Sequence, residues 1–208
     1  MRFYKLFIYA LLLILGRETA HAQINLLELE ELKGLEVGVI APSFDAVNQN
    51  GQRIHLDSIL KDGPLVIVFY RGQWCPFCNR HLDAFQDSLA LVSAFGANVV
   101  ALSPEQPTYL KAMESKLELS YDLLYDEGYK IASDYGLLFD PGVALRNRYN
   151  TFLNANFKEA HQDDRGFLPI PATFIIDRDR RVVWKHFDPN YKARSSVLKI
   201  LEVLTNLE

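Results

Sequence analysis

An uninterrupted apolar run that ends just before two closely spaced cysteines restricts the folds that this chain can adopt. The run Leu65 to Tyr70 has the sequence LVIVFY, and the segment Cys75-Pro-Phe-Cys78 follows it. A continuous β-branched and aromatic run predicts a strand that is buried on both faces, as in a parallel or mixed sheet. The two cysteines are therefore expected at the end of a central strand.

A stripe of apolar residues at spacings of four and three predicts a helix from the cysteines to about Phe95. Its members are Cys78, Leu82, Phe85, Leu89 and Val92. Two cysteines at positions i and i+3 of a first helical turn share one face and lie within disulfide reach. Free N–H groups and the helix dipole stabilise a thiolate at this end, which lowers a thiol pKa. Pro76 suits the first turn because its missing N–H costs nothing there.

The remaining sequence predicts strands and helices in alternation, with a β-hairpin ahead of them. Strands Phe44 to Val47 and Arg53 to Leu56 are expected to pair through a two-residue type I′ turn at Asn50-Gly51. Further strands are predicted at 97–102, 121–125, 174–177 and 182–187, and helices at 24–35, 108–117, 129–135 and 191–206. Residues 140–168 have little periodicity, which predicts an irregular segment that caps the site.

This order predicts an α/β fold, with a central mixed β-sheet flanked by helices and an N-terminal β-hairpin extension. The formal net charge of −4 lacks the basic excess that phosphate binding needs, so no nucleic-acid partner is expected.

The first residues carry an export pattern. Arg2 and Lys5 precede the apolar run Leu6 to Leu15, and Ala20-His21-Ala22 has the small-x-small pattern of a signal-peptidase site. The run is shorter than the roughly 20 residues that cross a bilayer. We therefore expect a signal peptide at residues 1–22 and a single domain at residues 23–208. The product would be exported, periplasmic or secreted, and free of the membrane after cleavage.

Three alternatives compete with redox chemistry at the cysteine pair. A structural disulfide would close too short a loop to stabilise the fold much. A zinc site built on Cys75, Cys78 and His81 would need a further ligand, and neither a second CxxC nor an HxxxH follows. A binding scaffold without enzymatic activity is the third alternative. No metal and no cofactor is expected, and His81 is expected to be a solvated or core histidine.

Four segments carry a resemblance to a known family: FYRGQWCPFC, VVALSPEQP, LPIPATFIID and HFDP. Over roughly residues 35–204 the chain resembles the peroxiredoxin-like branch of the alkyl hydroperoxide reductase/thiol-specific antioxidant family, within the thioredoxin superfamily. The resemblance implies a thioredoxin-like fold. On the peroxiredoxin motif Pro-x-x-x-Thr-x-x-Cys, Cys78 falls on the peroxidatic cysteine, Cys75 on the threonine and Arg71 on the proline. On the thioredoxin motif, Trp74 and both cysteines form Trp-Cys-x-x-Cys.

A second departure from the peroxiredoxin pattern lies at Pro171. Many peroxiredoxins carry an arginine there, ahead of a strand that here begins Ala172-Thr173. Thioredoxins have a cis-proline at this strand, packed on the cysteine pair, so the Ile170–Pro171 bond is expected to be cis. The alternative is a trans proline that opens a strand. The supporting site residues implied by the two motifs are Pro171, Trp74, Pro76, Arg71 and Thr173.

The resemblance implies a thiol-dependent peroxidase. Cys78 would attack hydrogen peroxide or an organic hydroperoxide, Cys75 would resolve the sulfenic acid, and a thioredoxin-like reductant would reset the pair. Arg71 or Arg80 is the expected substitute cation. The alternative is a periplasmic thioredoxin-like reductase without peroxidase activity. There Cys75 attacks a protein disulfide and Cys78 resolves the mixed disulfide, while Trp74, Pro76 and Pro171 shape a peptide-binding surface.

Overall fold

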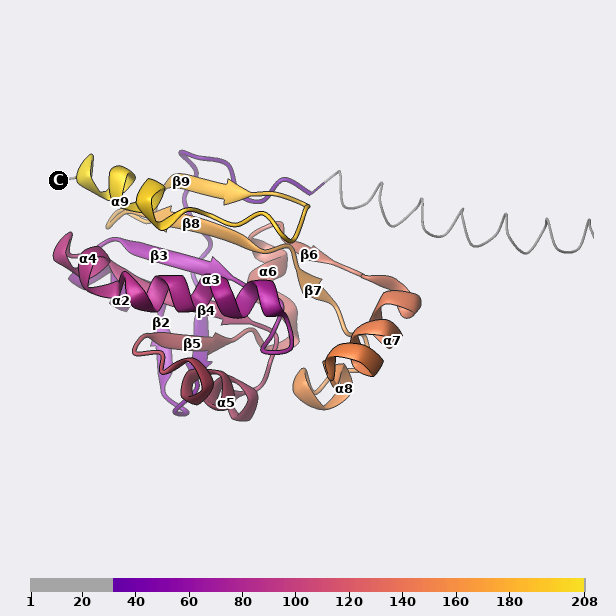
Figure 1. Cartoon of the computed structure of the whole chain (residues 1–208). Coiled ribbons are helices and arrows are strands. Elements are labelled where there is room, and N and C mark those ends of the chain that lie inside the picture. Colours follow the sequence, from indigo (N-terminus) through magenta and orange to yellow (C-terminus); the bar gives the residue numbers. More distant parts are fainter. Residues whose placement is uncertain (1–31, 208) are drawn as a thin grey trace, which may run out of the picture. The chain divides into compact units, whose positions relative to one another are not determined.

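The computed structural model describes residues 32–207 of the chain (Figure 1). The expected signal peptide at residues 1–22 lies outside the described residues. So does most of the leading helix expected at 24–35, and its described end, residues 32–35, is not helical. The segment Lys33–Glu208 forms one compact unit.

A seven-stranded mixed sheet in the order β2-β1-β5-β4-β3-β8-β9 lies at the centre of this unit. The bounds are β1 Asp45–Asn48, β2 Arg53–His55, β3 Leu65–Phe69, β4 Asn98–Ser103, β5 Asp122–Tyr125, β8 Ala172–Ile176 and β9 Val182–Phe187. β3 pairs parallel with β4 and antiparallel with β8. Every residue of β3 is buried, which confirms the central strand predicted from the apolar run.

The helices cover both faces of this sheet (Figure 1). Their bounds are α2 Leu56–Asp62, α3 Pro76–Asp87, α4 Leu89–Ala94, α5 Pro107–Leu117, α6 Lys130–Asp134, α7 Gly142–Leu153, α8 Phe157–Ala160 and α9 Val197–Thr205, with a 3₁₀ turn η1 at Glu127–Tyr129. The predicted mixed sheet flanked by helices is therefore confirmed. The helix expected to run from the cysteines to about Phe95 is divided at Ser88.

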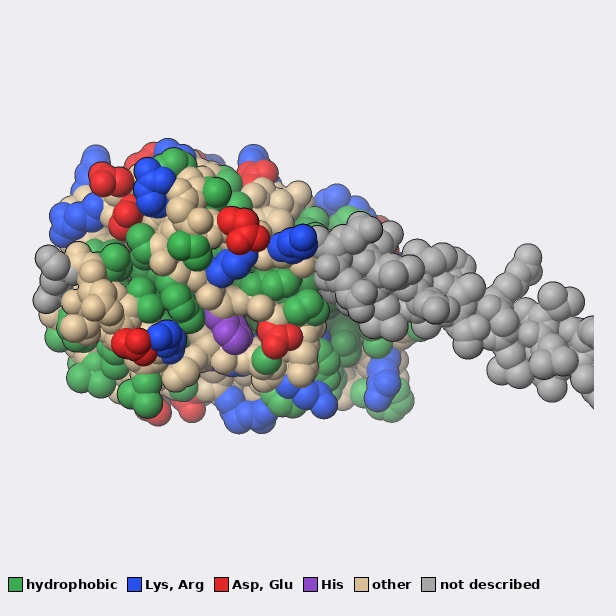
Figure 2. Space-filling model, turned by 90° about the horizontal axis from the view of Figure 1, so that it is seen from above, with side chains coloured by type: hydrophobic (Ala, Val, Ile, Leu, Met, Phe, Trp, Pro, Cys, Tyr) green, Lys and Arg blue, Asp and Glu red, His purple; other side chains and the backbone are tan. Residues whose placement is uncertain are grey.

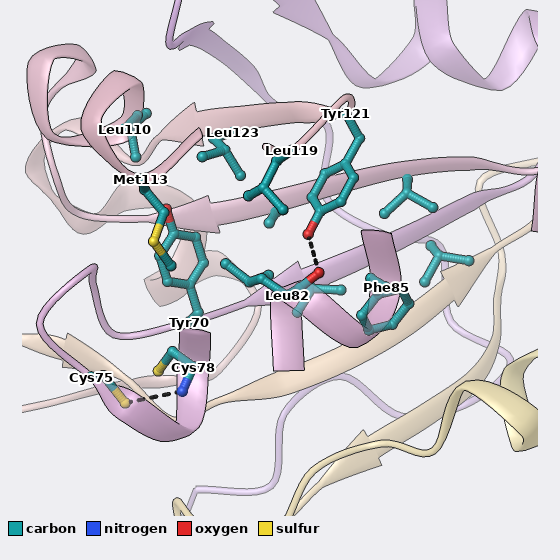
Figure 3. Close-up of a cluster of buried hydrophobic side chains, with 14 of the residues drawn as sticks. Tyr70, Cys75, Cys78, Leu82, Phe85, Leu110, Met113, Leu119, Tyr121 and Leu123 are labelled. Atoms are coloured by element: carbon teal, nitrogen blue, oxygen red, sulfur yellow. Dashed lines mark hydrogen bonds between the residues drawn. The ribbon is translucent and has the colours of Figure 1, made fainter. Parts of the chain in front are cut away.

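The sheet separates two apolar cores, as the alternation of side chains along β3 requires. Val66 and Val68 belong to the core that contains the buried residues of α3, α5 and α9. Leu65, Ile67 and Phe69 belong to the opposite core, which contains the buried residues of α2 and α6. Figure 3 shows the first core, where the Tyr121 hydroxyl donates to the carbonyl of Leu82 over 2.9 Å.

The N-terminal hairpin forms as predicted, but its turn differs. Asp45 pairs with His55 and Val47 with Arg53. The Asn48 N–H donates to the carbonyl of Gln52, which leaves a three-residue loop in place of the two-residue type I′ turn. The Asn48 side-chain oxygen accepts from the N–H groups of Asn50 and Gln52, so a local side-chain contact closes the longer loop. Leu56, expected at the end of the second strand, begins α2.

The segment 140–168, predicted to be irregular, contains the helices α7 and α8. It is bounded by the short strands β6 Leu138–Phe139 and β7 Leu168–Pro169, which pair antiparallel. No residue of α7 is buried, so its sequence carries no apolar stripe that would have revealed a helix. In Figure 1, α7 and α8 lie beyond the end of the sheet at which α3 begins.

The terminal helix was predicted to begin at Tyr191, but α9 begins at Val197. The residues before it, 188–196, form a non-helical segment that we call the strap. Within residues 32–207, no helix is long and apolar enough to cross a membrane. On the face seen in Figure 2, acidic and basic side chains are interspersed, without a continuous basic surface.

Candidate active site

Cys75 and Cys78 lie where β3 gives way to α3. Cys75 is the N-cap of α3, and its sulfur accepts a hydrogen bond from the Cys78 N–H over 3.3 Å (Figure 3). Pro76 occupies the first turn, as expected. Both cysteines are free thiols with no exposed surface. The sequence therefore placed this pair correctly, and the fold adds that both sulfurs are enclosed.

The pKa values of the two thiols shift in opposite directions. The hydrogen bond from the Cys78 side chain and the adjacent Arg71 guanidinium lower the pKa of Cys75 to about 5, against the opposing effect of burial. Burial, followed by the hydrogen bond to Cys75, raises the pKa of Cys78 well above its usual value. In the reduced pair Cys75 is therefore the thiolate and Cys78 the thiol at neutral pH.

Arg71 supplies the positive charge beside the Cys75 thiolate. Its Nη2 donates to the Cys75 sulfur over 3.2 Å, and its Nη1 donates to the Tyr149 hydroxyl over 3.3 Å. The guanidinium carbon lies 4.0 Å from the ring centre of Tyr191, 5.0 Å from that of Trp74 and 5.4 Å from that of Tyr149. We call these three rings the aromatic box. Such contacts hold a guanidinium in place when water is excluded.

The other arginine proposed from the sequence does not reach the sulfurs. Arg80 is exposed and lies 4.6 Å from the ring centre of Phe77. The second cation comes instead from the strap, where Arg194 Nη2 lies 3.6 Å from the Cys78 sulfur. No sequence signal pointed to Arg194. It lies far from the cysteines in the chain, and it falls within the helix expected at residues 191–206.

Of the expected supporting residues, Trp74 lies beside Arg71, whereas Thr173 is hydrogen-bonded to the strap. Trp74 lies in the aromatic box, with its ring centre 4.8 Å from that of Tyr149. Among the described residues, the hydrogen-bond partner of the Thr173 side chain is not a cysteine sulfur. The Thr173 hydroxyl shares a 2.9 Å hydrogen bond with Ser195, which in turn lies 2.9 Å from His81 Nε2. These contacts are buried and fix the strap against α3 and β8.

The peptide bond before Pro171 differs from the expectation drawn from the thioredoxin motif. Ala172 pairs with Phe69, so Pro171 lies one residue beyond the paired part of β8, beside the start of the cysteine loop. The described peptide bonds are all trans, so the expected cis bond at Ile170–Pro171 is wrong. The Ile170 N–H donates to the carbonyl of Leu137, and a trans bond lets the extended chain run from β7 into β8. A proline needs no partner for its nitrogen at the start of a strand.

His81 is buried, and its imidazole is neutral. Burial, with the charge of Arg194, lowers its pKa to about 4, and its Nε2 is engaged by Ser195. Among the residues that the structure describes, no group of three His, Cys, Asp or Glu side chains is placed to hold a metal ion.

Glu105 is a residue of the site that sequence reasoning missed. It follows β4, is fully buried, and its Oε2 accepts from the Gln73 N–H over 2.8 Å. A usable signal existed, because carboxyl ends of neighbouring parallel strands meet at one edge of a sheet. This rule would have placed an acidic residue just after the strand predicted at 97–102 near the cysteine loop.

Comparison with known proteins agrees with this geometry. The AhpC/TSA family model matches residues 37–185. Peroxiredoxin Q of Suaeda salsa is 34% identical over 119 residues, which are 57% of this chain and 55% of the relative. Peroxiredoxin Q of Arabidopsis thaliana is 34% identical over 143 residues, 66% of each chain. Both relatives are described as chloroplastic. The chain thus spans about half of the first of these relatives and about two thirds of the second.

Solved structures agree on the fold. Peroxidoxin BcpB from Mycobacterium tuberculosis superposes with a TM-score of 0.67 at 22% identity, covering 84% of this chain and 99% of that one. A peroxiredoxin-like protein from Aquifex aeolicus gives 0.65 at 20% identity, covering 85% and 90%. These neighbours establish the thioredoxin-like fold. Together with the family match over most of its length, they show that this chain belongs to the AhpC/TSA family.

Proposed function

We propose that this chain is a thiol-dependent peroxidase that reduces hydrogen peroxide or organic hydroperoxides through Cys75 and Cys78. One observation carries the proposal: the Cys75 sulfur is fully buried and lies 3.2 Å from the Arg71 guanidinium. An enclosed thiolate suits a small oxidant, because a protein disulfide must bring its own backbone against the attacked sulfur. The adjacent cation stabilises the negative charge that develops on peroxide oxygen.

The thiolate attacks the distal oxygen of the hydroperoxide. A sulfur–oxygen bond forms, the O–O bond breaks, and the departing alkoxide takes a proton to leave as an alcohol or water. Cys75 is thereby oxidised to a sulfenic acid. The Cys78 sulfur then attacks Cys75, water departs with the Cys78 proton, and a disulfide forms. A thioredoxin-like dithiol donor supplies the two electrons and two protons that reset the pair. This assignment exchanges the roles that the resemblance implied for the two cysteines.

The test is stopped-flow oxidation of the reduced domain by hydrogen peroxide, followed through Trp74 fluorescence in a Trp184→Phe background. We expect a second-order rate constant far above that of a free thiol, and its loss in Cys75→Ser. A rate no faster than free cysteine would refute the peroxidase.

The second candidate is a protein-disulfide reductase. It is favoured by the acidities of the pair, with a low pKa on the N-cap Cys75 and a raised one on Cys78. That difference suits a sequence in which Cys75 attacks and Cys78 resolves. Mixed disulfides through Cys75 that accumulate in Cys78→Ser, with no peroxide consumption in the unaltered protein, would establish it.

The export pattern supports a periplasmic or secreted location, with residues 1–22 removed and residues 23–208 left as a single domain. The compact unit Lys33–Glu208 is consistent with the domain part of this proposal. Mass spectrometry of the protein from fractionated cells tests it. A mature chain that begins at Gln23 in the exported fraction is expected, and an uncleaved chain in the cytosol would contradict it.

A further inference from the structure

A fully buried carboxyl group beneath the cysteine loop has no role in the steps above. Glu105 has no exposed surface. Its Oε2 accepts one hydrogen bond, from the Gln73 N–H, and its Oε1 has no partner among the described residues. No described lysine, arginine or histidine forms an ion pair with it, although ten such pairs occur elsewhere in residues 32–207. A buried carboxylate with so little compensation is costly, so the protonated acid is the favoured form.

The carboxyl group packs directly against the loop that carries Cys75. A Cβ atom at Gly72 would lie 2.6 Å from Glu105 Oε1. The Cys75 N–H donates to the Gly72 carbonyl over 3.1 Å, so this glycine links the carboxyl group to the N-cap cysteine. The unpartnered oxygen therefore lies against the loop residue to which Cys75 is hydrogen-bonded.

The groups that face Glu105 favour a neutral acid. Burial raises its pKa to about 8, and the Cys75 thiolate adds to this rise, against the hydrogen bond from Gln73. Tyr70 at the end of β3 and Tyr109 on α5 are the other titratable groups beside it. Arg71, the cation of the cysteine loop, donates to the Cys75 sulfur rather than to this carboxyl group. At neutral pH a thiolate at Cys75 and a protonated carboxylic acid at Glu105 thus adjoin the same loop.

Peroxide cleavage at Cys75 needs a proton, because the departing oxygen is a strong base. Arg71 donates hydrogen bonds but does not release its proton. His81 is neutral and lies against Ser195. Cys78 is a weak acid because its pKa is raised. Among the described neighbours of Cys75, the carboxyl group of Glu105 is the strongest acid that still carries its proton.

We infer that Glu105 is the proton donor to the oxygen that leaves when Cys75 is oxidised, an inference that rests on the peroxidase function proposed above. The Cys75 thiolate forms its bond to the distal oxygen, the O–O bond breaks, and the Glu105 proton moves to the departing alkoxide. The products are the sulfenic acid, an alcohol or water, and the Glu105 carboxylate. The dithiol that later reduces the disulfide returns one proton to this carboxylate and one to the Cys78 thiol.

The test compares two oxidants that differ in the basicity of the departing oxygen, at pH 6.5. tert-Butyl hydroperoxide releases the strongly basic tert-butoxide, and peroxyacetic acid releases acetate, which needs no proton. Glu105→Gln keeps the shape and an acceptor for the Gln73 N–H. We expect it to lose at least about 100-fold in rate with tert-butyl hydroperoxide, the low end for general acid catalysis, and less than about twofold with peroxyacetic acid. The exposed Glu127→Gln is the matched control and should leave both rates unchanged.

Alkylation by iodoacetamide separates this role from a structural one, because it consumes the thiolate without a departing oxygen. Its rate should be the same in Glu105→Gln and the unaltered protein. Equal losses with both oxidants, or slowed alkylation, would overturn the inference while leaving the peroxidase intact. An unaltered protein no faster than a free dithiol would overturn both.

The unaltered protein gives a second measurement that needs no folded variant. Its rate with tert-butyl hydroperoxide should fall as pH rises above about 8, while alkylation stays constant. A hydroperoxide rate that follows the alkylation rate up to pH 10 would refute the proton transfer.

Discussion

Arg71 and Cys75 form the central contact of the site, with Nη2 of the arginine 3.2 Å from the sulfur. The three rings of the aromatic box contact the guanidinium, and Arg71 is only 3% exposed, so the positive charge stays beside the thiolate. Of the two sulfurs, only that of Cys75 accepts a hydrogen bond from Arg71 among the described contacts. The difference in acidity between the two cysteines thus depends on side chains from three separate parts of the chain.

Removing this cation should raise the pKa of Cys75. We expect Arg71→Met to raise it by about 1–3 units, the usual effect of an adjacent opposite charge. Titration of thiolate absorbance at 240 nm, in a Cys78→Ser background with one titrating thiol, measures the change. Arg80→Met is the control, because Arg80 is exposed and lies over Phe77. An unchanged titration in Arg71→Met would mean that the hydrogen bond from residue 78 alone sustains the thiolate.

The two single cysteine variants should behave differently toward peroxide. Cys78→Ser retains Cys75 and Arg71, so it should react once and stop as a sulfenic acid that dimedone labels at Cys75. Cys75→Ser leaves only the thiol with the raised pKa, and its rate at pH 7 should fall more than about 100-fold, as the thiolate fraction requires. Stopped-flow traces and mass spectrometry of the labelled protein give both results. Labelling at residue 78 would restore the assignment implied by the peroxiredoxin motif.

The stability of the reduced protein should increase with pH because of Cys75. The folded pKa is about 5, and an unfolded thiol has a pKa of about 8.5. Between these values the unfolded chain binds the extra proton, so the free energy of unfolding rises with pH at up to about 1.4 kcal/mol per unit. This stabilisation is lost as pH falls through about 5. Urea titrations of the reduced protein and Cys75→Ser from pH 5 to 8.5 should therefore diverge. Parallel curves would contradict the lowered pKa.

Gly72 should tolerate no side chain. Its φ is +149°, and an added Cβ would lie 2.5 Å from Trp74 Nε1 and 2.6 Å from Glu105 Oε1. We expect Gly72→Ala to destabilise the protein by about 2–4 kcal/mol, since strain and overpacking add. Gly38→Ala is the control, with φ of +94° and no heavy atom within 4 Å of the added Cβ. Its cost should be about 1 kcal/mol, the low end for a residue other than glycine at a sparsely populated φ, and should come from the backbone alone. Equal losses in urea titrations would exclude crowding at Gly72.

Tyr191 should limit access of large reagents to the sulfurs. Its ring lies 4.0 Å from the Arg71 guanidinium, and Tyr191→Ala removes that side of the aromatic box. We expect the reaction of Cys75 with the bulky disulfide DTNB to accelerate more than its reaction with iodoacetamide. Phe152→Ala is the control, because Phe152 is 77% exposed on α7. A ratio of the two rates that stays constant would show that access does not pass this ring.

The central strand and the cysteine helix were predictable because their signals are local. Buried β-branched residues mark β3, and the apolar stripe from Cys78 to Val92 marks the helices that follow it. Ser88 breaks that stripe into two helices without interrupting its spacing, so periodicity alone could not detect the division. The helix α7 was missed for a related reason, since an element with no buried residue has no apolar face to repeat.

The site was predictable only in its local part. Trp74, Cys75, Pro76 and Cys78 are adjacent in sequence, and helix-start chemistry identifies them. Tyr149 and Arg194 contribute through a tertiary arrangement that no spacing encodes. The cis bond expected at Pro171 was carried over from a motif, and the trans chain from β7 to β8 overrides it.

The strap has a consequence for biosynthesis. Tyr191, Arg194 and Ser195 are translated more than 100 residues after the cysteine pair, whose surroundings they complete. While the ribosome still holds this segment, the nascent thiols lack part of their electrostatic partner set and keep a more ordinary reactivity. The reactive sulfur is thus a late product of folding, and a chain truncated before residue 188 would carry the cysteine motif without the complete site.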